Sequence, residues 1–165
     1  GDFSCEGCPE NCCRTRFYNH TLIEYFYLME GLAGFSADEQ AAIQARAADV
    51  CRDVAAAEAD GNTPRIMCPL NNDGLCGAYE HRLMICRLHG LPYELRTPGR
   101  EPFYGGGCQV FTDACGDKSY IPFDRTPFYQ AMAGLEKELR DALGTSRKFK
   151  KTIAEMIVNG PDISG

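Results

Sequence analysis

Two stretches decide how this chain is organised: residues 5–14, CEGCPENCCR, and residues 68–87, CPLNNDGLCGAYEHRLMICR. They hold seven of the ten cysteines in 165 residues, and Cys108 follows a run of three glycines. A Cys-x2-Cys turn places two sulfurs about one metal's width apart, as zinc and iron–sulfur proteins require. We therefore predict a cysteine-rich metal centre with eight ligands: Cys5, Cys8, Cys12, Cys13, Cys68, Cys76, Cys86 and Cys108.

Disulfide bonding is the main alternative use of these thiols, because ten is an even number and a secreted chain could pair them all. Two features favour metal instead. A chain of this length can bury a core without covalent cross-links. A disulfide between the adjacent Cys12 and Cys13 would be strained.

The patterning predicts one small α+β domain over residues 1–165, mostly α, with short β pieces and long ordered loops. The capping-box sequence Ser36-Ala-Asp-Glu39 opens the strongest helix, which we expect to end at Ala59 before Asp60-Gly61. The spacing of apolar residues and the positions of proline and glycine predict four further helices, two of them in a C-terminal region at about 127–159. The predicted ranges are 21–31, 78–89, 126–143 and 147–158.

The β structure is expected to be short. Residues 65–67 are a strand candidate, and the turn sequence Asn71-Asn72-Asp73-Gly74 predicts a hairpin that brings Cys68 and Cys76 together. Residues 91–126 show little periodicity, so we predict a long ordered loop there, held by a metal ligated by Cys108.

Composition argues against two classes of partner. The formal charge of -6 disfavours electrostatic binding of DNA or RNA. No run of apolar residues reaches the eighteen or so that a membrane helix needs.

No HExxH, Gly-x-Ser-x-Gly or dinucleotide-binding pattern is present in the sequence, so no catalytic residues are predicted. A metalloenzyme with an open coordination position stays an alternative.

The other cysteines and the histidines are weaker ligand candidates. Cys51 lies among alanines in a predicted helix, which is typical of a core thiol, whereas Cys115 could be a core thiol or a ligand. His20, His81 and His89 could complete a mixed site or be ordinary polar histidines. Arginines near the two stretches could stabilise a negatively charged thiolate centre, and these are Arg14, Arg16, Arg65, Arg82 and Arg87.

The order of these residues resembles the CxxCxxCC cysteine-cluster family, often called YkgJ-like, which is described as zinc- or iron-chelating. The matching segments are Cys5…Cys8…Cys12-Cys13-Arg14, Cys68-Pro69-Leu70, Leu75-Cys76, Tyr79-Glu80-x-Arg82 and Cys86-Arg87, within residues 5–110. The chain has three residues between Cys8 and Cys12 where the family usually has two, and Leu83 where the family usually has proline. The resemblance implies a bacterial, cytoplasmic protein that binds metal through the shared cysteines.

Three hypotheses about function follow. The first is a zinc protein in which the metal has a structural or metal-handling role. The second is an iron protein, with a [4Fe–4S] cluster used in electron transfer or redox sensing. The third is a metalloenzyme of unknown reaction. The sequence indicates a metal ion as the ligand and identifies no protein partner.

Overall fold

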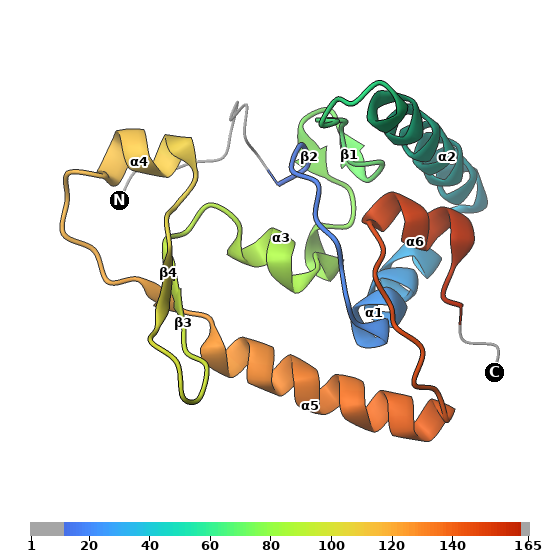
Figure 1. Ribbon diagram of the computed structural model, residues 1–165. Helices are drawn as coiled ribbons and strands as arrows, with labels where there is room; N and C mark the ends of the chain where they lie inside the picture. Colours follow the sequence, from blue (N-terminus) through green and yellow to red (C-terminus); the bar gives the residue numbers. More distant parts are fainter. Residues whose placement is uncertain (1–11, 163–165) are drawn as a thin grey trace.

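A computed structural model describes residues 12–162 of the chain (Figure 1). Within that range none of the helices has both the length and the apolar character needed to cross a membrane. The elements of the described residues are mostly helical, and in chain order they are α1 (Leu22–Ala33), α2 (Ala37–Ala59), β1 (Asn71–Asn72), β2 (Leu75–Cys76), the 3₁₀ helix η1 (Tyr79–His81), α3 (Met84–Leu88), β3 (Tyr93–Leu95), β4 (Phe103–Gly105), α4 (Gln109–Cys115), β5 (Phe123–Asp124), α5 (Thr126–Leu143) and α6 (Ile153–Asn159). The prediction of a mostly α structure with short β pieces is confirmed.

The long helix α2 is built as its sequence predicts. The Ser36 hydroxyl accepts from the Glu39 amide, and the Glu39 carboxylate accepts from the Ser36 amide at 2.9 Å. Ile43 and Ala47 are buried along one face of the helix. The helix ends at Ala59, and Gly61 takes a positive φ of 74° just beyond it.

The predicted hairpin is also present. Asp73 and Gly74 form the two-residue connection between β1 and β2 with positive φ values of 49° and 89°, a geometry that favours an Asp-Gly pair. The register pairs Asn71 with Cys76. The hairpin therefore returns Cys76 to the side of the chain on which Cys68 lies.

Two predictions around this hairpin are wrong. Residues 65–67 are not a strand, and Ile66 instead lines an apolar pocket. The predicted helix over 78–89 is interrupted, because Arg82 and Leu83 have extended backbone with ψ values of 133° and 157°. Leu83 is buried in the core, so tertiary packing overrides the helical preference of the segment.

Residues 91–126 are not the long ordered loop that we predict from the sequence, because they contain regular secondary structure. They contain α4 and a three-stranded sheet of order β4-β3-β5, in which β3 is antiparallel to β4 and parallel to β5. Arg125 anchors this sheet, since its guanidinium lies 3.6 Å from the Tyr93 ring centre and donates to the Leu88 carbonyl. Strands of two or three residues are too short to show periodicity in a sequence.

The C-terminal helices combine a confirmed and a corrected prediction. Helix α5 begins at Thr126-Pro127 and ends before Gly144, whose φ is 64°, as predicted. The last helix begins at Ile153 and not at 147, because Thr152 and Glu155 form a second capping box. Just before it, Lys151 exchanges backbone hydrogen bonds with Asn19, of 2.8 and 3.0 Å.

The apolar core joins helices from both ends of the described chain. Helix α6 lies against α2, and α1 lies against α5 and η1 (Figure 1). Cys86 belongs to this core, and Cys12, Cys68 and Cys76 pack against it as partly buried residues. Besides Cys86, the buried apolar residues of the core are Leu22, Leu28, Leu32, Ile43, Leu70, Ala78, Leu83, Phe149 and Met156.

Two buried carboxylates connect the helices. Helices α1 and α3 have no capping hydrogen bond from the side chain of the residue before them. Glu136 on α5 accepts instead from the Ile23 amide of α1 at 3.0 Å, and Glu24 on α1 accepts from the Met84 amide of α3 at 3.1 Å. Each acid therefore satisfies a backbone donor that would otherwise lack a partner at a helix start.

This arrangement predicts that Glu136→Ala lowers the free energy of unfolding by about 2 kcal/mol, because the partly buried Ile23 amide and the Arg140 guanidinium lose a charged partner. Urea denaturation measures the change. Glu138→Ala, an exposed position on the same helix, is the control and should shift stability by less than about 0.5 kcal/mol. Equal changes in the two variants would contradict the role of Glu136 as the partner of the Ile23 amide.

Candidate metal centre

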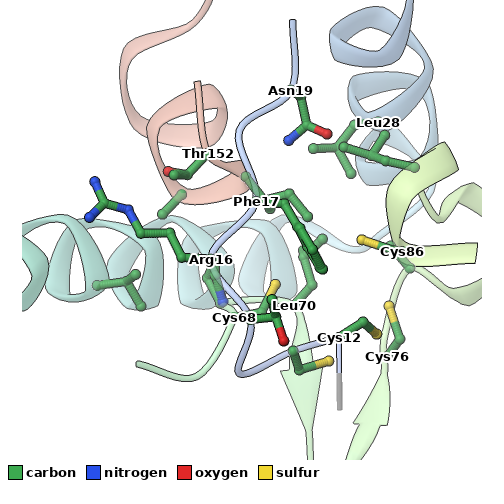
Figure 2. Close-up of a pocket in the computed structure, with 18 of the residues that line it drawn as sticks. Cys12, Arg16, Phe17, Asn19, Leu28, Cys68, Leu70, Cys76, Cys86 and Thr152 are labelled. Carbon is green, nitrogen blue, oxygen red and sulfur yellow. The ribbon is translucent and has the colours of Figure 1, made fainter. Parts of the chain in front are cut away.

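Five cysteines line one pocket beside the apolar core. They come from four parts of the chain: the first described turn, the segment before the hairpin, strand β2 and helix α3. Figure 2 shows four of them, Cys12, Cys68, Cys76 and Cys86, converging on the pocket from separate segments. The pocket encloses about 80 Å³, and its five thiols are Cys12, Cys13, Cys68, Cys76 and Cys86.

Backbone contacts hold these segments together. The Cys68 amide donates to the Cys13 carbonyl at 2.7 Å, which joins the first described turn to the segment before the hairpin. The Gly77 amide donates to the Leu70 carbonyl at 2.8 Å and closes the base of the hairpin. Helix α3 carries Cys86, and the carboxylate of Glu24 fixes the start of that helix.

The thiols interact directly with one another. The side chain of Cys12 is hydrogen-bonded to those of Cys13 and Cys86, and the Asn71 amide lies beside Cys13. Cys68 lies close enough to Cys13, Cys76 and Cys12 for their charges to interact. The five side chains therefore form one cluster.

Burial and neighbouring thiols raise the pKa of Cys12, Cys13, Cys68 and Cys76. Burial is the main cause that raises the pKa of Cys68, to about 12, and it also raises the pKa of Cys76. The hydrogen bond to Cys12, followed by burial, raises the pKa of Cys13 far above its usual value. The hydrogen bond from Cys13 lowers the pKa of Cys12, but the hydrogen bond with Cys86 and burial have a larger combined effect, so the pKa is raised. A cation is needed before several of these thiols can ionise together.

Arg82 is a cation at this cluster. Its Nη2 lies 3.6 Å from the Cys12 sulfur and donates to the Cys86 carbonyl. Burial lowers the pKa of Arg82, but the charges of Cys12, Cys86 and Cys76 outweigh that effect and raise it. Positive charge is therefore already present where thiolates would form.

The donor set suits a soft metal, but the donors are not preassembled. Among the described His, Cys, Asp and Glu side chains, no three surround a common point at metal-binding distance. The thiols hydrogen-bond to one another instead, and Cys5 and Cys8 lie outside the described residues. The chemistry of five clustered sulfurs fits zinc or an iron–sulfur cluster, both of which are bound through thiolates.

The structure separates the other candidate cysteines from this pocket. Of the described cysteines, Cys51, Cys108 and Cys115 are not among the lining residues. Cys108 directly precedes α4, where its amide donates to the Gly90 carbonyl at 3.2 Å, and Cys115 ends that helix. No disulfide joins any two of the eight cysteines within residues 12–162.

The candidate histidines have different surroundings. His81 lines the thiol pocket and stacks on Tyr27 with ring centres 4.9 Å apart. His89 packs edge-on against Phe17, and His20 is exposed. Sequence reasoning missed that Asn71 lies beside Cys13, although the predicted hairpin turn begins at that residue.

No protein-family model, no curated protein and no solved structure matches this sequence. The resemblance to the CxxCxxCC family therefore stays a prediction that rests on the order and spacing of the cysteines.

The raised pKa of Cys68 predicts how metal-free protein responds to alkali. The Cys68 thiol has a pKa of about 12 in the folded protein, compared with 9.0 for an unperturbed thiol. Its contribution to the free energy of unfolding is therefore complete below pH 9 and is lost as the pH rises toward 12. Unfolding free energy should fall by about 1 kcal/mol per pH unit above pH 9 from this group. Urea denaturation of chelator-treated protein measures the slope, which should be smaller in Cys68→Ala; identical slopes would contradict the assignment.

Proposed function

We propose that this chain is a metal-binding protein whose clustered thiolates hold zinc in a structural or metal-handling role. The observation that supports this most is the convergence of five cysteines from four segments on one pocket. A protonated thiol packs like a small apolar group, so burial alone gives no reason for five of them to meet at one pocket. A bound cation that joins the four segments would give that reason.

The described thiols are numerous enough for a complete zinc site. Structural zinc takes four tetrahedral ligands, often all cysteine, and Cys12, Cys13, Cys68, Cys76 and Cys86 exceed that number by one. When bound, the ion would cross-link the segments and keep the thiolates ionised. Cys5 and Cys8 stay predicted ligands from the sequence, and so does Cys108, which would need a second site.

An iron–sulfur cluster is the second candidate. The contact between Arg82 and the Cys12 sulfur favours it, because hydrogen bonds to ligand sulfurs are one way in which proteins tune such clusters. A cluster would imply electron transfer or redox sensing.

Elemental analysis and a visible spectrum of protein purified without air distinguish the two. The zinc proposal predicts a colourless protein with one or two zinc atoms per chain. Iron with acid-labile sulfide, and an absorbance that bleaches on reduction, would support the second candidate. Protein without either metal would contradict both.

Single cysteine variants test which thiols bind. Cys76→Ser should lose metal and stability together, because metal-binding energy becomes folding energy. Cys51→Ser is the matched control, since Cys51 is also a partly buried cysteine but lies on α2 outside the pocket. It should keep its metal and lose only a small packing contribution. Metal content and thermal unfolding report the two effects, and equal metal loss in both variants would contradict the division.

A further inference from the structure

Arg82 occupies an unusual position in the chain. It lies between η1 and α3, where the backbone leaves the helical conformation for two residues. This break separates two stretches that would otherwise continue as one helix. The extended conformation places Arg82 on the wall of the thiol pocket together with Leu83.

The guanidinium of Arg82 connects two cysteines from distant segments. Nη2 approaches the Cys12 sulfur at 3.6 Å and donates to the carbonyl of Cys86, 74 positions later in the chain than Cys12. The ring of Tyr79 lies 5.2 Å from the guanidinium carbon and supports it from another side. The side chain is therefore held against both the sulfur of one cysteine and the backbone of another.

The charge of Arg82 is directed at the thiols. Among the described ion pairs none involves Arg82, and its buried Nε has no hydrogen-bond partner. Two other candidate arginines are engaged elsewhere. Arg16 pairs with Glu58, and Arg87 donates to the carbonyls of Arg82 and Glu80.

We propose that Arg82 is a positioning residue of the metal centre, which holds Cys12 next to Cys86 and supplies the positive charge that a set of thiolates requires. This inference rests on the proposed function. Four thiolates around a divalent ion carry two excess negative charges, and a neighbouring guanidinium reduces that excess. Among the described thiols, only the Cys12 sulfur accepts a hydrogen bond from Arg82. Cys12 is therefore the ligand that we expect the site to lose when Arg82 is replaced.

The test uses the full chain loaded with Zn²⁺ and, separately, with Co²⁺, whose visible and near-ultraviolet spectrum reports the number of bound thiolates. Arg82→Gln should weaken Zn²⁺ binding about 10- to 100-fold in a chelator competition, which is the usual effect of removing a residue that hydrogen-bonds to a metal ligand. Its Co²⁺ complex should show less sulfur-to-cobalt absorbance, equivalent to one thiolate. Arg82→Lys should recover part of the affinity, because an ammonium keeps the charge but cannot hold both contacts.

Arg52→Gln is the matched control, since it removes the same charge from an exposed site on α2 and should change neither quantity. Circular dichroism of each variant establishes that it folds, and Arg82→Lys serves as the test if Arg82→Gln does not. If the wild type binds metal and the Arg82 variants bind it with the same affinity and spectrum, this inference is wrong while the proposed function stands. A wild-type chain that binds neither metal would overturn the proposed function and this inference with it.

Discussion

The burial of sulfur against the apolar core is the constraint on which the rest of this structure depends. Leu70 and Leu83 belong to the core and also line the thiol pocket, so the thiols share the low-dielectric surroundings of the leucines. In such surroundings a single thiolate is costly, and neighbouring thiolates are costlier still. The same packing that stabilises the fold therefore makes the cluster dependent on a cation for ionisation.

The sequence predicts this structure best where the signal is local. The capping box at Ser36, the Asp73-Gly74 turn and the Thr126-Pro127 helix start each depend on a few adjacent residues, and all three are confirmed. The three-stranded sheet was missed because its strands are too short to show a pattern and because β3 pairs with the distant strand β5. The break at Arg82 was missed because contacts with Cys12 and the core cause it, and these depend on the tertiary structure.

The candidate site was predicted in part for the same reason. The turn at residues 71–74 gave a local reason to bring Cys68 and Cys76 together, and the structure places both in the pocket. No short motif around Cys108 predicts that it lies apart from these residues. Its separation from the pocket follows from the β3–β4 pairing and from α4, which place it beside Gly90. Cys5 and Cys8 lie outside the described residues.

The two buried carboxylates give helix α5 a connection to the cysteines that the linear order of the chain conceals. Glu136 of α5 holds the start of α1, and Glu24 of α1 holds the start of α3, which carries Cys86. The path from α5 to that cysteine thus consists of one intervening helix and two hydrogen bonds. Helix α5 therefore influences where the Cys86 thiol lies, although none of its residues lines the thiol pocket.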